Sequence, residues 1–137
     1  MHARVTPDWG FDAAAISRFA STLDGLFRDL LADARFEDIV ARYLREGRHE
    51  NPDRVPEWFT AAYFHLAGEL AGEVRDAGLE LEALLAIEGP AAFLPDLDDR
   101  LDDPDRRATL LRTLERIESE PDLLGAGPRL LAIGRRR

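Results

Sequence analysis

The 137-residue sequence contains no cysteine and no lysine, and each absence excludes a kind of chemistry. Without cysteine the chain has no thiol nucleophile, no disulfide framework and no cysteine-based zinc site. Without lysine it cannot form a Schiff base or present the lysine of a phosphate-binding P-loop. All 18 basic residues are therefore arginines.

Long apolar runs and an excess of positive charge are also missing. Every apolar stretch is interrupted by Asp, Glu or Arg well before the ~20 residues that a membrane span requires, so we expect no membrane contact. The first ten residues show no secretory signal, which predicts a cytoplasmic location. The formal net charge is -9 and the acidic and basic residues are interleaved, so we expect no nucleic-acid partner.

The composition that remains is that of one ordinary folded domain. Hydrophobic residues make up 45% of the chain and charged residues 33%. A chain of this length buries enough apolar surface to form its own core without a metal or disulfide. We interpret residues 1–10 as an N-terminal arm and residues 11–137 as the domain.

Apolar residues recur at helical spacing in two neighbouring segments. The first runs from Phe19 to Leu31, and the second from Phe36 to Leu44, where Gly47 and then a proline stop the pattern. Together they predict a helical hairpin. A loop at residues 51–56 then leads into an aromatic group, Trp58, Phe59, Tyr63 and Phe64.

The later segments alternate between helix and strand. A third helix is expected to begin near His65 and to end before Gly78, because glycine suits the left-handed position just past a helix end. Alternation over residues 79–87 predicts a strand. Asp103 followed by Pro104 predicts the start of a fourth helix, because a carboxylate caps the helix and proline fits its first position. Residues 129–133 predict a final strand.

The segment from Phe11 to Ile16 is ambiguous on its own residues. Its three alanines favour a helix by propensity, whereas Gly10 and the brief apolar block also suit a buried strand. Periodicity does not decide between the two, so both interpretations stay open at this point.

Residues that could carry chemistry are few. An acidic cluster offers oxygen ligands to a hard cation, but it lacks the glycine and distal glutamate of a calcium loop. The cluster consists of Asp96, Asp98, Asp99, Asp102 and Asp103. We interpret it as solvated carboxylates of a loop with a helix cap, and expect no metal site. The serines lack the flanking glycines of a nucleophile elbow, so no catalytic residue is predicted.

The aromatic group has two interpretations. Bulky aromatic residues usually fill a core, which is the favoured reading, but they also line pockets for apolar ligands. For a pocket, the candidates are Phe27 and Trp58 as walls, with Tyr63 and His65 at its mouth. A small hydrophobic ligand would then be a partner, although an isolated histidine near a helix start is more often a polar contact.

Several stretches together resemble the C-terminal half of bacterial class I S-adenosylmethionine-dependent methyltransferases of the small-molecule type. They are FDAAAISRFA at residues 11–20, WFTAAYFH at 58–65, the run of residues 69–79 that ends in AGL, EGP at 88–90 and RLLAI at 129–133. In that order, they are similar to five parts of the family's fold. These are the fifth strand with the start of a lid, the return from the lid, the helix with the entry to the sixth strand, the exit from the sixth strand, and the closing seventh strand.

The resemblance implies an α/β fold, namely a truncated methyltransferase-like (Rossmann-like) module. We expect a small mixed three-stranded sheet, an inserted helical lid over residues 19–48, and about four to five helices. In the family the seventh strand lies antiparallel between the fifth and the sixth. The donor binds at a glycine-rich turn after the first strand, and this sequence has no counterpart to it. We therefore expect no S-adenosylmethionine site in the isolated chain unless a partner supplies one.

Two classes of function follow from the resemblance and the residues. The first is an accessory or binding module, or one half of a split methyltransferase. The alternative is a small-molecule enzyme that uses an aromatic pocket with His65 and Tyr63, or a fragment with no separate activity. The family's strands one to four are missing, which leaves the outer edge of residues 11–16 unpaired. This predicts a homodimer, or a complex with a partner chain, through that edge.

Overall fold

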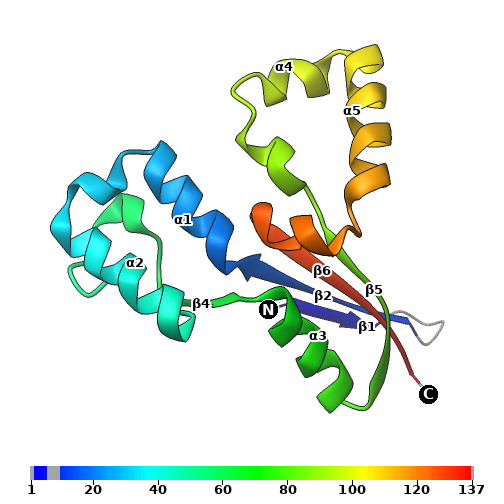
Figure 1. The fold of residues 1–137 in the computed structure, drawn as a ribbon, viewed down its shortest axis with the longest axis horizontal. Coiled ribbons are helices and arrows are strands. Elements are labelled where there is room, and N and C mark those ends of the chain that lie inside the picture. The colour runs from blue at the N-terminus through cyan, green and yellow to red at the C-terminus, as the bar shows by residue number, and fades with distance from the viewer. Residues whose placement is uncertain (1, 6–9, 137) are drawn as a thin grey trace.

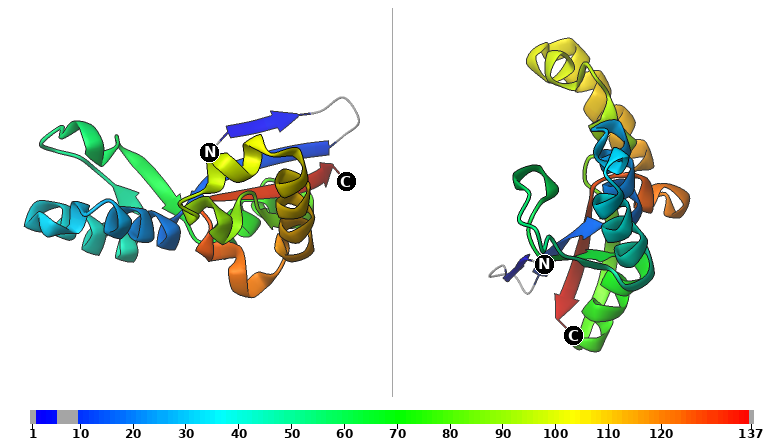
Figure 2. Two further views of the ribbon diagram at one scale, coloured as in Figure 1. Left: turned by 90° about the horizontal axis from the view of Figure 1, so that it is seen from above. Right: turned by 90° about the vertical axis from the view of Figure 1, so that its left-hand side faces the viewer.

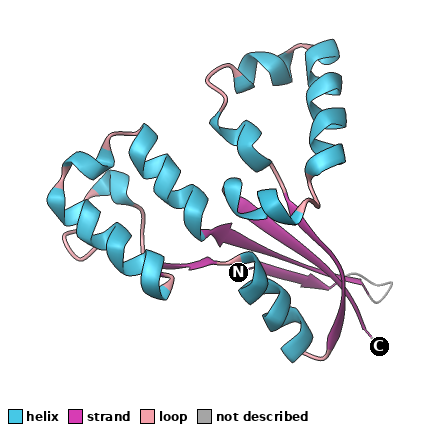
Figure 3. Cartoon of the chain, in the orientation of Figure 1, coloured by secondary structure: helices cyan, strands magenta, loops and turns pink. Residues whose placement is uncertain are grey.

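The computed structural model describes residues 2–5 and 10–136 of the chain, which form a mixed sheet with helices around it (Figures 1 and 3). The strands are β1 (His2–Val5), β2 (Gly10–Ser17), β3 (Arg48–His49), β4 (Ala62–His65), β5 (Leu79–Ala86) and β6 (Arg129–Arg136). The α-helices are α1 (Arg18–Phe27), α2 (Ala34–Glu46), α3 (Ala67–Asp76), α4 (Leu97–Asp102) and α5 (Pro104–Ile117). Short 3-10 turns are η1 (Leu30–Ala32), η2 (Pro56–Trp58), η3 (Gly89–Phe93) and η4 (Pro121–Ala126).

The sheet has the strand order β3-β4-β2-β6-β5, and β1 also pairs with β2. Strand β6 is antiparallel to both of its neighbours, β2 and β5, as expected for the three strands predicted from the sequence. The expected three-stranded sheet is nevertheless too small, because β4 adds to β2 in parallel and β3 adds to β4. These added strands have two to four residues, too few to show a period-two pattern.

The outer side of β2 is occupied by the chain itself. Strand β1 pairs antiparallel with it from Phe11 to Ala14, and β4 pairs with Ile16 and Ser17. The expectation that residues 11–16 have an unpaired outer edge is therefore wrong. Assembly with a second copy or a partner chain at residues 11–16 stays a prediction, and it now requires β1 to leave.

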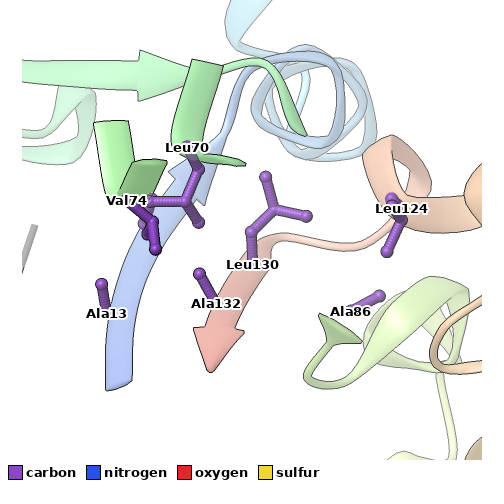
Figure 4. Close-up of a cluster of buried hydrophobic side chains, with 8 residues drawn as sticks. Ala13, Leu70, Val74, Ala86, Leu124, Leu130 and Ala132 are labelled. Carbon is purple, nitrogen blue, oxygen red and sulfur yellow. The ribbon is translucent and has the colours of Figure 1, made fainter. Parts of the chain in front are cut away.

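One core lies between the sheet and α3 (Figure 4). Ala13 pairs with Ala132 across β2 and β6, and these small side chains let α3 approach closely enough to bury Leu70 and Val74. Ala13, Ala15 and Ser17 alternate as buried positions along β2. The alanines that favoured a helix by propensity therefore serve a buried strand, because tertiary packing outweighs propensity.

The helices form two arms (Figure 1). One arm holds α1 and α2, and the other holds η3, α4 and α5, as the left view of Figure 2 also shows. The two arms meet where Phe27 of α1 contacts Phe93 of η3. Helix α1 ends at Phe27, before the predicted Leu31, and left-handed Asp29 follows it. Among the described residues no helix combines the length and apolar character needed to cross a membrane.

The other predicted boundaries can be compared directly. The start of α5 after Asp103 is confirmed, since the Asp103 carboxylate accepts hydrogen bonds from the N–H groups of Asp105 and Arg106. The third helix was predicted to begin near His65, but residues 62–65 form β4 and α3 begins at Ala67. The acidic segment that was interpreted as a loop contains α4.

Candidate functional site

A cavity of about 420 Å³ lies at the carboxyl ends of β2 and β4. Ile16 and Phe64, which pair in register across the two parallel strands, both line it. Helix α1 contributes Ala20 and Asp24 to the wall, and η3 contributes Phe93 from the other arm. In open α/β sheets, ligands bind outside the carboxyl ends of the strands, so this is the position where a site is expected.

The inner wall is aromatic. The Phe36 and Trp58 rings have centroids 5.4 Å apart, and the Tyr43 and Phe64 rings 4.9 Å apart, in tilted and edge-to-face arrangements. All four side chains are buried and belong to one cluster beneath α2. A cavity of this volume with aromatic walls is typical of sites for small organic molecules.

The charged groups around the cavity include one more carboxylate than guanidinium groups. Three carboxylates and two guanidinium groups line it. Arg28 pairs with Asp24 at 3.2 Å and also donates to the carbonyl oxygen of Glu57 at 3.3 Å. Arg129 pairs with Glu88 at 3.5 Å. Both cations therefore already have anionic partners, and an anionic ligand would meet an acidic rim.

His49, which also lines the cavity, is buried and neutral. Its Nε2 lies 2.6 Å from the carbonyl oxygen of Trp58. Because a carbonyl only accepts, Nε2 must carry the proton and Nδ1 must present a lone pair. Burial lowers the pKa of His49, and it outweighs the hydrogen bond to Trp58, which acts in the opposite direction. The Nδ1 atom is buried and has no hydrogen-bond partner within the described part of the chain.

The other polar groups of the wall have partners. The Tyr43 hydroxyl lies 3.0 Å from the Thr22 hydroxyl, and burial raises the pKa of Tyr43, which keeps the phenol protonated. Ser21 donates from its hydroxyl to the carbonyl oxygen of Ser17 at 2.7 Å. The hydroxyl groups of Tyr43 and Ser21 therefore do not need a hydrogen bond from a ligand.

The four residues predicted to form a pocket do not come together in this cavity. Trp58 lines it. Phe27 is exposed, and its ring packs edge-on against Phe93 at 5.4 Å. Side chains alternate along a strand, so Tyr63 and His65 lie on the other face of β4 from Phe64, and neither lines the cavity.

Tyr63 belongs instead to a network centred on buried Arg18. The Arg18 Nη2 donates to the Tyr63 hydroxyl at 3.2 Å and to Glu69 Oε1 at 2.8 Å, while its Nε donates to the Phe64 carbonyl oxygen at 3.1 Å. Tyr63 in turn donates to Glu69 Oε2. That hydrogen bond to the carboxylate, with partial burial and the negative charge of Glu69, raises the pKa of Tyr63.

His65 lies beside Tyr63, with ring centroids 4.8 Å apart. Its Nε2 is 3.0 Å from Glu73 Oε1, one turn further along α3 than Glu69. The histidine is buried, so this contact joins β4 to α3. The predicted mouth of the pocket is therefore a packed strand-to-helix junction.

Sequence reasoning missed Arg18, Glu69 and His49. Glu69 alone had a local signal, because it stands three residues after the start of a helix, where a carboxylate often bonds the preceding N–H. Its Oε1 accepts the Leu66 N–H at 2.8 Å. Arg18 and His49 carry no such signal, since their partners lie on other elements.

The acidic cluster has ordinary partners. Asp96 accepts hydrogen bonds from Arg100 at 2.9 Å and from Arg106 at 3.0 Å, and the hydrogen bond from Arg100 is the main reason for the lowered pKa of Asp96. Within residues 2–5 and 10–136 no group of three or more His, Cys, Asp or Glu side chains is placed to hold a metal ion.

The turns between strands and helices are where a methyl donor such as S-adenosylmethionine would bind. The two turns that lead from a strand into an α-helix, Ser17–Arg18 and His65–Ala67, contain no glycine. The Ser17 N–H is bonded to the Pro128 carbonyl oxygen at 2.9 Å, and the Leu66 N–H to Glu69. These turns do not fit the glycine-rich donor site of the family that the sequence resembles. Comparison with protein-family models and with curated proteins finds no match to this chain.

Proposed function

We propose that this protein binds a small aromatic molecule in the cavity at the carboxyl ends of β2 and β4. The position of that cavity carries the proposal, because two parallel strands end beneath it and seven aromatic or histidine rings line it. These are the rings of Phe36, Tyr43, His49, Trp58, Phe59, Phe64 and Phe93. Such a site selects a flat apolar ligand by shape and by ring contacts.

The wider role that we propose is that of a substrate-side module of a methyltransferase-like protein. The antiparallel placement of β6 between β2 and β5 supports it, as does the helical insertion that follows β2, because both agree with the resemblance seen in the sequence. In this proposal S-adenosylmethionine is held by another chain or segment. The module then contributes binding and orientation of the acceptor molecule.

The alternative, chemistry at Tyr63 and His65, has less support. Both side chains are bonded to carboxylates of α3, and neither lines the cavity. A general base or acid must reach the reacting group of a bound substrate. We therefore do not assign a reaction to this pair.

The cavity is tested by filling it. In the wild-type protein, 2-naphthol should raise the melting temperature in a dose-dependent manner, because a ligand that binds only the folded state stabilises it. Ala92 lines the cavity and Ala91 does not, although both belong to η3. Ala92→Trp should abolish the shift, whereas the matched variant Ala91→Trp should keep it. Equal shifts in both variants would place the ligand elsewhere.

The donor part of the proposal is tested by calorimetry with S-adenosylmethionine. We expect no saturable heat at micromolar donor, with or without 2-naphthol, because neither strand-to-helix turn is a glycine-rich loop of the kind that holds the donor. Saturable binding to this chain would contradict the division of roles that we propose. It would leave the aromatic cavity itself unaffected.

A further inference from the structure

The Nδ1 atom of His49 is an unmet hydrogen-bond acceptor inside an aromatic wall. The residue is 3% exposed, and Nδ1 has no partner among the described residues. A buried acceptor without a donor costs free energy relative to one that is bonded. The tautomer is fixed by the Trp58 carbonyl at Nε2, so His49 cannot relieve this cost by turning its proton to the other nitrogen.

The surroundings restrict which ligand can supply the missing donor. The ring of His49 stacks on Phe64 with centroids 5.0 Å apart, which orients it as part of a flat apolar wall. Arg28 and Arg129 are already paired with carboxylates, so the cavity offers no unpaired cation to a carboxylate or phosphate ligand. A neutral aromatic ligand fits the wall and the charges together.

A ligand reaches Nδ1 only if a neighbouring ring moves, because the atom itself has almost no exposed surface. Among the described residues three rings contact that of His49, and Phe59 is the exposed one. It lines the cavity, is 54% exposed, and its centroid lies 6.1 Å from that of His49. Its backbone has φ 67 and ψ 177, a region that residues with a Cβ rarely adopt.

That strained conformation is held by a neighbouring loop residue. Asn51 donates from Nδ2 to the carbonyl oxygens of Phe59 at 2.9 Å and Val55 at 2.8 Å, and its Oδ1 accepts the Val55 N–H at 3.0 Å. Strained residues of this kind cluster at ligand sites and at segments that move. The loop from β3 to β4 thus presents an exposed aromatic side chain beside the unmet acceptor.

We propose that the ligand is an uncharged aromatic molecule with a hydroxyl or N–H group, and that this group donates a hydrogen bond to His49 Nδ1 after the Phe59 ring swings aside. This inference rests on the proposed function, which supplies the cavity. It adds the chemical class of the ligand and the atom that recognises it.

The test compares 2-naphthol with its methyl ether, 2-methoxynaphthalene, which has no donor. In the wild type, 2-naphthol should bind about tenfold more tightly by calorimetry, the ratio typical of one buried hydrogen bond. In His49→Phe, which keeps the ring stack, the two ligands should bind with equal affinity. Equal affinities in the wild type would overturn the inference while leaving the cavity in place, whereas no binding of either ligand would overturn the proposed function itself.

A second test of the hydrogen bond to His49 uses only the wild-type protein, so it does not depend on whether His49→Phe folds. In the wild type, the nitrogen-15 resonance of His49 Nδ1 should move on addition of 2-naphthol and stay in place on addition of the ether. Identical responses to the two ligands would overturn the inference.

The movement of Phe59 is tested separately. Phe59→Gly removes both the ring and the backbone strain, so association of 2-naphthol should become several-fold faster in stopped-flow fluorescence. Phe59→Leu keeps a Cβ and a bulky side chain, and its association rate should remain close to that of the wild type. An unchanged rate in Phe59→Gly would show that another group controls access.

Discussion

The Arg18 guanidinium donates from Nη2 to Glu69 Oε1 at 2.8 Å and joins two helix starts that are 51 residues apart in the sequence. Arg18 is the first residue of α1, and Glu69 lies in the first turn of α3. The same side chain bonds the Phe64 carbonyl oxygen on β4. One buried arginine therefore fastens β4 beside β2, and these two strands end beneath the cavity.

Replacing this arginine should destabilise the fold. Arg18→Met removes the donor to Phe64 and leaves the Glu69 carboxylate without its cation, so we expect a loss of about 2 kcal/mol in the free energy of unfolding. Arg28→Met, in an exposed ion pair with Asp24, should change it by less than about 0.5 kcal/mol. Urea denaturation measures both, and equal losses would contradict the role of Arg18.

Gly47 should tolerate a methyl group far less well than Gly78. Both have a left-handed backbone, with φ of 80 and 79. A Cβ at Gly47 would lie 2.6 Å from the Tyr63 ring and 2.5 Å from Arg18 Nη2, whereas at Gly78 it would meet nothing within 4 Å.

We expect Gly78→Ala to cost about 1 kcal/mol, the backbone term alone. Gly47→Ala should cost about 1–3 kcal/mol more, because the Arg18 network must shift. Thermal unfolding of the two variants measures the difference. Equal costs would show that the network gives way without penalty.

Stability should depend on pH through Glu69. Partial burial opposes ionisation of this carboxyl, but the hydrogen bonds from Tyr63 and Leu66 and the charge of Arg18 outweigh it and lower the pKa below its ordinary value of 4.5. The ionised group therefore stabilises the folded state above pH 4.5, and this contribution is lost as the pH falls through the lowered pKa.

Glu69→Gln should accordingly be less stable than the wild type at pH 7, and the difference should shrink below pH 4.5. Urea denaturation at several pH values measures it. In the Arg18→Met background the pH dependence of that difference should be weaker, because one cause of the lowered pKa has been removed. A difference that is constant with pH would contradict the assignment.

Assembly through the β2 edge should depend on β1. Because His2–Val5 pairs with Phe11–Ala14, deleting residues 1–5 should expose unpaired backbone groups and raise the fraction of dimer at a given concentration. Size exclusion with light scattering gives the mass of both forms. The same mass for the full and the shortened chain would show that this edge does not drive assembly.

The sequence by itself determined those helix starts and ends that depend on a few neighbouring residues. Asp103 and Pro104 start α5, and Gly47 and Gly78 take left-handed positions just after α2 and α3, because caps and left-handed glycines act within one helical turn. The amphipathic pattern of α2 was equally local. The predicted strands β5 and β6 also appear, each longer or shorter by only a few residues.

Tertiary structure decided the rest. Residues 11–16 became a strand because β6 and β1 supply hydrogen bonds on both sides. Residues 62–65 became a strand because Phe64 and His65 pair with Ile16 and Ser17 of β2. Trp58 alone, of the four predicted pocket residues, reached the cavity. The faces of Tyr63 and His65, the partners of Arg18 and the unmet acceptor of His49 depend on contacts between segments far apart in the chain, and no local pattern encodes such contacts.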